Sequence, residues 1–370
     1  MKFAVIFVVI ATIAALPRFG QRENEHQPTV SDSDLYLEMA RVFTGDKAGF
    51  NPEWVAWQPH HYNRPLLPFV AGHLGKYLLG GNLRAAFSIV NILCAALVAM
   101  LLMRYLREHR PEWKLCWAPS VLFLTAFPQI NWGYHIFTDT TGYGTAMALA
   151  MCGDACLKQS SPARLVGLLV VSVTAYLARE TAWLAVFAVG AAGIARKDWP
   201  RLALVLAVMI LGNVPHLVYA SVFSVSGVPL TSTVAALLNW RYVVDFALKT
   251  GVCFNLSWIP ALLWLRHRAA IPPLIVGWAI GAVLYMGAGY FANTFDVIGY
   301  PLRLSYALFP LVFFCVTEVF ERWFTPDTRT LRMLQFCGLQ FAVNMLGVFL
   351  DPGRPGIKAT DLIRDSFRKR

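Results

Sequence analysis

Long apolar runs constrain this chain more than any other feature of its sequence. Runs of about 15 to 24 apolar residues recur along most of its length, and a bilayer core needs roughly 20 helical residues to cross. Apolar residues make up 57% of the chain and charged residues only 14%. A soluble domain is about 45–50% apolar and about 25% charged, so this chain has too little polar surface to cover a soluble globule. We therefore expect an all-α, polytopic transmembrane helical bundle.

The same composition excludes several other classes. A chain this apolar is not disordered, and its continuous runs differ from the short alternating segments of outer-membrane barrels. The net charge of +11 is explained by membrane topology and lipid contact, so no nucleic-acid partner is predicted. The seven cysteines form no pair of C-x-x-C motifs, and Cys152 and Cys156 have the spacing of one packed helix face.

The apolar runs predict about ten or eleven membrane segments within a domain at 1–350, followed by a basic tail at 351–370. The first run favours a retained anchor over a cleaved signal peptide. A last crossing would place the tail outside, so either that segment is re-entrant or an earlier assignment is wrong, and the sequence leaves both open. The predicted segments are 3–17, 83–103, 115–130, 140–157, 164–178, 181–195, 202–223, 242–265, 271–290, 304–320 and 333–350.

The long polar stretch at 18–82 is the predicted first outer loop. Within it, Asp32–Phe43 has the pattern of an amphipathic helix with Ser31 as its cap, and 66–79 is interrupted by His73, Lys76 and glycines. We expect both to be interfacial helices and not crossings.

Loop charges support this topology. Basic residues concentrate on the predicted inner side, as the positive-inside rule requires. The inner loops hold Arg104, Arg107, Arg110, Lys114, Lys158, Arg164, Arg196, Lys197, Arg201, Arg266, Arg268, Arg322, Arg329 and Arg332, whereas the short outer loops hold Arg179, Arg241 and Arg303.

Polar residues near the predicted outer face form one candidate site. They come from five separate stretches of sequence and include acids, histidines and arginines. The members are Asp32, Asp34, His60, His61, Tyr62, Arg64, His135, Asp139, Arg179, Glu180 and Arg303.

The order of these motifs resembles the polytopic GT-C superfamily of membrane glycosyltransferases. The likeness lies in a first membrane helix, a long outer loop opening on Asp32, Tyr36 and Ala40 in SDSDLYLEMA, and two interfacial helices. It extends to the string YNRPLLP at 62–68, the step Thr138-Asp139, the pair Arg179-Glu180, and Arg303 before Pro310. Many relatives have an acidic pair where this chain has Asp32-Ser33, so either Asp32 or Asp34 matches the family's catalytic carboxylate.

The resemblance implies an inverting transfer of sugar from a polyprenyl-phosphate donor to an acceptor on the extracytoplasmic face. A phosphate leaves as an anion without a general acid, so one carboxylate acts as the base, and Asp32 is preferred over Asp34. Arg179 and Arg303 are candidates for holding the leaving phosphate. The other site residues, Tyr36, His61, Tyr62, Arg64, His135, Asp139 and Glu180, are expected to bind substrate.

Partners and location follow from the same resemblance. The expected partners are a polyprenyl-phosphate-linked sugar, a glycan, lipid or protein acceptor, and membrane lipids. We expect a multi-pass protein of the bacterial cytoplasmic membrane. No cofactor is assigned, and a divalent metal at His60 and His61 is an open alternative because these residues lie near carboxylates.

Other interpretations compete with catalysis. Asp32 and Asp34 also suit a helix N-terminus electrostatically. A transporter or flippase would use Asp139, Asp245 and Lys249 along a pathway, and a non-catalytic relative would bind glycolipid. Sidedness separates these classes, because a transporter needs polar groups open to both faces.

Overall fold

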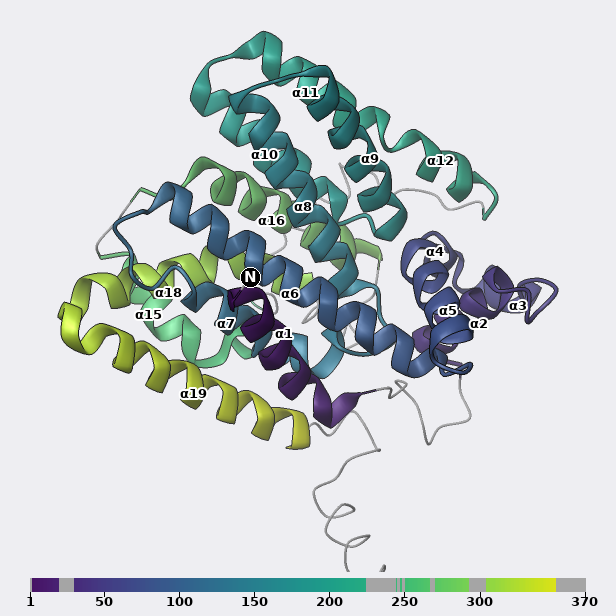
Figure 1. The fold of residues 1–370 in the computed structure, drawn as a ribbon, viewed down its shortest axis with the longest axis horizontal. Helices are drawn as coiled ribbons and strands as arrows, with labels where there is room; N and C mark the ends of the chain where they lie inside the picture. Colours follow the sequence, from purple (N-terminus) through teal and green to yellow (C-terminus); the bar gives the residue numbers. More distant parts are fainter. Residues whose placement is uncertain are drawn as a thin grey trace, which may run out of the picture.

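The computed structural model describes residues 2–19, 30–223, 244, 247, 250–266, 270–292 and 304–350. Within these ranges the regular structure is entirely helical (Figure 1). Arg303, Asp245, Lys249 and the tail at 351–370 lie outside the described residues.

The helices follow one another with short connections. They are α1 (Lys2–Ala15), α2 (Asp32–Phe43), α3 (Pro52–Trp57), α4 (Pro59–Tyr62), α5 (Leu66–Leu78), α6 (Leu83–His109), α7 (Ala118–Leu124), α8 (Asp139–Lys158), α9 (Pro162–Ala178), α10 (Ala182–Arg196), α11 (Trp199–Leu211), α12 (Val214–Ser221), α15 (Trp258–Trp264), α16 (Pro273–Ala292), α18 (Phe309–Trp323) and α19 (Pro326–Leu350). Short turns of other helix types are η1 (Leu16–Arg18), η2 (Gln129–Gly133), η3 (Asn255–Ser257) and η4 (Tyr306–Leu308).

Local sequence signals account for several helix starts. Asn82 and Ser161 accept hydrogen bonds from the first-turn amides of α6 and α9, and Asp198 does the same for α11. Proline occupies the first turn of α9 and α11, where no helical amide is needed. The helices expected at 32–43, 66–79 and 83–103 are all present, although α6 continues to His109.

The predicted crossing at 115–130 is wrong as a continuous helix. The structure has the seven-residue α7, a turn, and then the π-helical η2. Pro128 has no amide to donate and therefore cannot extend the α7 ladder. The Asn344 side chain of α19 donates to the carbonyl of Thr125 at 2.8 Å, which satisfies a group released at the break. The expected 202–223 helix is similarly divided into α11 and α12 at Gly212 and Asn213.

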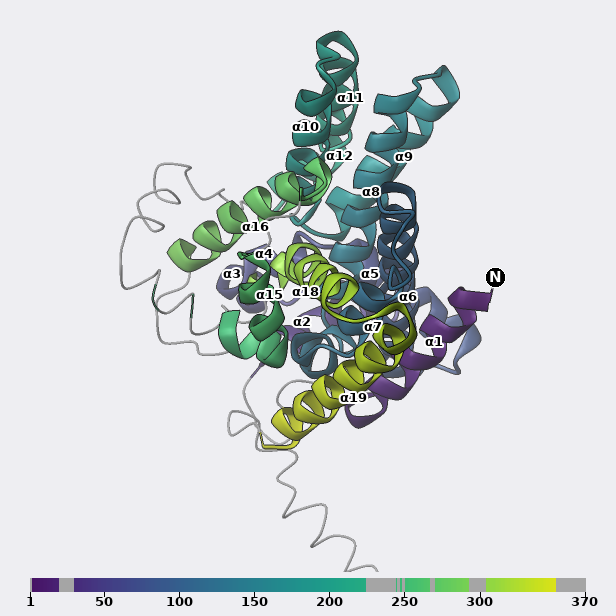
Figure 2. The same ribbon diagram turned by 90° about the vertical axis from the view of Figure 1, so that its left-hand side faces the viewer.

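Two groups of helices frame the candidate site. α6 packs along α1, α5 and α8, and α8 in turn contacts α9 and α10. In both ribbon views α9, α10 and α11 project together from one end (Figures 1 and 2). The short helices α2 to α5 gather at another side, where α5 packs on α2 and on the beginning of α6.

Small residues allow close helix contacts. A Cβ added at Gly277 of α16 would lie 2.3 Å from the carbonyl oxygen of Phe187 in α10. A Cβ at Gly153 of α8 would lie 2.6 Å from a methyl group of Val189, also in α10. Small residues at such contacts are typical of membrane helix pairs.

Large apolar side chains are exposed on the outside of several helices. They include Val5 and Ile13 of α1, Val166 and Val170 of α9, and Leu211 of α11. By length and composition, α6 and the stretch Trp199–Ser221 qualify as membrane spans among the described residues. An exposed apolar surface of this kind marks contact with lipid or with a partner.

Candidate functional site

The first turn of α2 separates the two candidate catalytic acids. Asp34 accepts hydrogen bonds from the backbone amide and the hydroxyl of Ser31, both at 2.9 Å. These contacts form a capping box, so Asp34 stabilises the helix start. Asp32 lies on another face of α2, together with Tyr36, because residues four apart share a helix face.

Asp32 faces the short helix α4. Its Oδ2 atom lies 3.1 Å from Nε2 of His61, and its side chain is 25% exposed while that of His61 is buried. The ring of His61 also packs edge-on against the Tyr36 ring, with centroids 5.5 Å apart. The structure therefore joins a partly exposed carboxylate to a buried imidazole from a separate helix.

The turn between α4 and α5 delivers Arg64. The following Pro65 disfavours helical geometry at Arg64, so α4 ends before it. The guanidinium donates to both carboxylate oxygens of Glu180, at 3.0 and 2.5 Å, and to the Tyr36 hydroxyl at 3.0 Å. This bidentate pair connects the first loop to the turn between α9 and α10.

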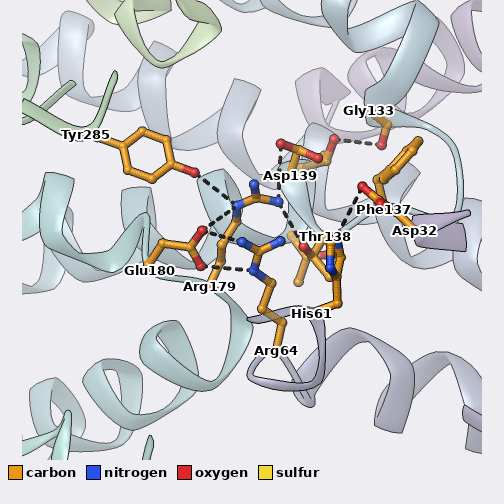
Figure 3. Close-up of polar contacts among 12 residues, drawn as sticks. Asp32, His61, Arg64, Gly133, Phe137, Thr138, Asp139, Arg179, Glu180 and Tyr285 are labelled. Atoms are coloured by element: carbon orange, nitrogen blue, oxygen red, sulfur yellow. Dashed lines mark hydrogen bonds and ion pairs between the residues drawn. The ribbon is translucent and has the colours of Figure 1, made fainter. Parts of the chain in front are cut away.

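Arg179 occupies the centre of the network (Figure 3). It ends α9 in an extended backbone conformation, and its side chain is only 1% exposed. Its Nη1 atom lies 3.2 Å from Oδ1 of Asp139 and donates to the Thr138 hydroxyl at 2.9 Å, and its Nε donates to the hydroxyl of Tyr285 at 3.3 Å. Thr138 and Asp139 begin α8, and Tyr285 belongs to α16, so the end of α9 and two other helices meet at this guanidinium.

Two buried polar atoms in this network have no hydrogen-bond partner within the described part of the chain. They are Nη2 of Arg179 and Oδ2 of Asp139. A buried donor or acceptor without a partner costs about 1–3 kcal/mol, and a charged group costs more. Such atoms indicate a place where a polar ligand would gain hydrogen bonds.

The opposite charges set the protonation of the site. Burial opposes ionisation of Glu180, but Arg64 and Arg179 outweigh it and lower the pKa of Glu180 to about 2. Burial likewise opposes the charge on Arg179, while Asp139 and Glu180 raise its pKa above the ordinary value. Burial raises the pKa of Tyr36, which keeps the phenol protonated. The network is therefore ionised at its two arginines and at Glu180 in neutral solution.

Tyr62 and His135 occupy different surroundings from the arginines. The Tyr62 hydroxyl donates to Glu38, and its ring packs on Phe50 with centroids 5.0 Å apart. The backbone carbonyl of His135 accepts from the Asn91 side chain at 2.6 Å, and its buried ring lies 6.1 Å from that of Phe137. The His60 ring lies beside the His61 ring, with centroids 4.2 Å apart and the ring planes tilted by 43°.

Sequence reasoning missed Glu38, which is 3% exposed in the middle of α2. It receives hydrogen bonds from Tyr62 and Lys47 and from the amide of Asn51 at 2.8 Å. Thr138 and Tyr285 were also missed as partners of Arg179. The structure buries all of residues 35–40, and no local sequence pattern singled out Glu38 among them.

A cleft of about 820 Å³ opens beside the other face of α2. Asp34, Glu38 and Arg41 line it from that helix, and Lys47 and Trp54 line it from the following segments. The cleft combines both charge signs with an indole, a surface that suits a polyhydroxylated or charged ligand.

Metal binding finds limited support in the described residues. Asp32 and His61 are both of ligand type, but the described part of the chain has no group of three or more His, Cys, Asp or Glu side chains that could hold a metal ion. The sequence matches no protein-family model and no curated protein.

Proposed function

We propose that this protein is an integral membrane glycosyltransferase of the GT-C type, which transfers a sugar from a polyprenyl-phosphate donor to an acceptor on the extracytoplasmic face. The observation that carries the proposal is the position of Asp32. It is a partly exposed carboxylate paired with His61 at 3.1 Å, beside a network of two buried arginines.

Asp32 is the proposed base because its surroundings differ from those of Asp34. The capping contacts of Asp34 commit both its position and one of its oxygens to the helix start. Asp32 instead faces an imidazole, with its Oδ2 atom 3.1 Å from Nε2 of His61, and its side chain stays partly exposed. As the acceptor oxygen bonds to the anomeric carbon, its proton passes to Asp32. The bond from that carbon to the phosphate oxygen breaks with its electron pair leaving on phosphate, so the anomeric centre inverts.

Arg179 and Arg64 supply the positive charge that a leaving phosphate requires. Both are buried, where a fixed guanidinium stabilises developing negative charge more strongly than in water. The Nη2 donor of Arg179 has no partner in the described part of the chain, so it can bind a phosphate oxygen without breaking the pair with Asp139. Arg303, the other predicted phosphate ligand, lies outside the described residues.

A membrane location explains the exposed apolar surface. A polyprenyl chain is insoluble in water, so an enzyme using it works where the chain stays in lipid while its phosphate reaches the surface. The apolar outer faces of α1, α9 and α11 suit a multi-pass arrangement in the bacterial cytoplasmic membrane. The loop charges place the network on the outer side under this topology.

The test compares the two acids directly. Purified protein in liposomes is given a panel of radiolabelled polyprenyl-phosphate sugars with candidate glycan, lipid and protein acceptors. We expect one donor to be consumed by wild type, and expect Asp32→Asn to lower turnover by about 10²–10⁴-fold while donor binding is retained.

Asp34→Asn serves as the matched control because it removes the same charge two residues away. It should keep most of the activity, since an amide oxygen can still accept the capping bonds. Loss of turnover in Asp34→Asn alone would transfer the role of base to Asp34. Absence of turnover with every donor, together with uptake of solute or flipping of lipid, would favour a transporter instead.

A further inference from the structure

A second cavity lies away from the candidate site, at the opposite ends of α6, α8 and α9. It has a volume of about 680 Å³. α8 packs against both α6 and α9, so it forms the floor of a groove between these two helices. The residues that line the groove repeat at helical spacing, for example Leu97, Leu101 and Arg104 on α6 and Arg164, Leu168 and Val171 on α9.

The groove is apolar along its length and basic at one end. Leu97 and Leu101 precede Arg104 on α6, and Leu168 and Val171 follow Arg164 on α9. α6 and α9 run in opposite directions along the groove, because the C-terminal end of α6 and the beginning of α9 both lie at its basic end. From Arg104 to Leu97 the apolar wall extends about 10 Å along the helix, given a rise of about 1.5 Å per residue.

The two arginines are available to a ligand. The acids in the groove are already neutralised, since Lys158 pairs with Glu108 and Asp154, and Asp154 also pairs with Arg196 at 2.7 Å. Arg164 donates to the backbone carbonyl of Gln159 at 2.8 Å. Within the described part of the chain, neither Arg104 nor Arg164 has a carboxylate within ion-pair distance, so positive charge remains uncompensated at this end.

Gly167 leaves room in the wall. A Cβ added there would meet no atom within 4 Å, so the groove is open beside α9. Val166 and Val170 of the same helix are 62% and 60% exposed, which makes this helix suited to contact with lipid.

We propose that this groove binds an anionic phospholipid, with an acyl chain along Leu97 and Leu168 and its phosphate at Arg104 and Arg164. The ligand must join an apolar chain to an anion, because the groove joins an apolar wall to two arginines. Basic pockets between membrane helices on the cytoplasmic side suit such headgroups, and the loop charges predict that this end faces the cytoplasm. The inference rests on the proposed membrane location but not on sugar transfer.

The experiment measures lipid binding by native mass spectrometry. Delipidated full-length protein in detergent is titrated with phosphatidylglycerol, or with phosphatidylcholine carrying the same acyl chains. We expect phosphatidylglycerol to bind selectively. Arg104→Gln should weaken its binding about five-fold, since each basic residue near an anionic headgroup contributes modestly. Lys197→Gln, which removes one charge from an exposed residue after α10, should leave binding unchanged.

A filled groove gives an independent test. Gly167→Leu should abolish selective binding, because the added side chain occupies the space of the acyl chain. Gly190→Leu is its control, since a Cβ at Gly190 also meets nothing within 4 Å but Gly190 does not line the groove. Both variants should unfold at the wild-type temperature or above it.

Three outcomes would overturn the proposal. They are equal binding of both lipids, unchanged binding in Gly167→Leu, and displacement of phosphatidylglycerol by millimolar inorganic phosphate, which would indicate a simple anion site. Sugar transfer is assayed on the same preparations. Failure of lipid selectivity with intact transfer rejects this inference alone, and selective lipid binding without transfer rejects the proposed enzyme alone.

Discussion

At the scale of single residues, the buried charges of the network decide what the site can do. Arg64 and Arg179 each pair with a carboxylate from a different segment, so the arginines are held in fixed positions. Burying charged groups costs free energy that their pairing only partly returns, whereas removing one partner leaves an uncompensated charge. Removing either partner of a pair is therefore expected to destabilise the protein.

The pairing of Arg179 with Asp139 is testable by a double-mutant cycle. Arg179→Met should lower the free energy of unfolding by about 3–5 kcal/mol, because Asp139 then stays buried without its counter-charge. Asp139→Asn should also destabilise, and the double variant should lose less than the sum of the two single losses. The free energy of unfolding of all four proteins is measured in detergent, with circular dichroism as the signal for unfolding. Additive losses would show that the two side chains do not interact.

The low pKa of Glu180 predicts an acid dependence of stability. Its pKa in the folded protein is about 2, below the ordinary value of 4.5, so the folded state binds this proton less readily than the unfolded state. Its stabilising contribution is then complete above about pH 4.5 and is lost as the pH falls toward 2. The difference in unfolding free energy between wild type and Glu180→Gln should shrink over this window.

Glu53→Gln is the control for that titration, because Glu53 is exposed and has no ion-pair partner among the described residues. The same pH series on Glu53→Gln measures the effect of removing an exposed carboxylate. A difference in unfolding free energy between wild type and Glu180→Gln that did not change with pH would contradict the coupling to the arginines.

At the scale of helices, the sequence patterns predicted which helices exist better than they predicted whether a helix is continuous. The capped amphipathic pattern of 32–43 corresponds to α2, and the interrupted apolar run at 66–79 corresponds to α5. Both predictions used local signals, which act within a few residues. Pro128 is a local signal for the break after α7, but the freed carbonyl of Thr125 is satisfied by Asn344, which lies 219 residues away. An apolar run cannot reveal such a contact.

The close contact of α16 with α10 gives a prediction at this scale. Gly277→Ala should lower the free energy of unfolding by about 1–3 kcal/mol, because the new methyl group meets the Phe187 carbonyl and must push the helices apart. Gly190→Ala in α10 should be neutral or stabilising by up to about 1 kcal/mol, because its Cβ has open space and alanine favours helix. Thermal unfolding of the two variants measures these changes in stability, and equal effects would contradict the close packing of α16 on α10.

At the scale of the whole molecule, the proposed topology places Glu53 on the extracytoplasmic side of the membrane and Lys197 on the cytoplasmic side. Glu53→Cys should react with a membrane-impermeant maleimide in intact cells, whereas Lys197→Cys should react only after permeabilisation. The seven native cysteines are buried or half-buried, so wild-type protein provides a low background. Reaction of both variants in intact cells, or the reverse pattern, would reject this topology.

The candidate site was partly predictable at this scale. The asymmetry of loop charges grouped Asp32, Arg64, Asp139, Arg179 and Glu180 on one predicted face, and the structure joins these residues in two ion-pair clusters beside each other. Glu38 and Tyr285 escaped prediction, because each is marked by a partner distant in sequence and not by a local pattern.

The sequence by itself determined the helical class and most helix positions, because apolar periodicity, caps and prolines act through neighbouring residues. Only the tertiary structure decided which charges pair. Arg64 meets Glu180 across 116 residues, and Tyr36 meets Thr138 across 102. It also distinguished Asp34, bound into a helix cap, from Asp32, which faces an imidazole. The physical reason is that pairing depends on how helices pack in space, and many packings share the same local pattern.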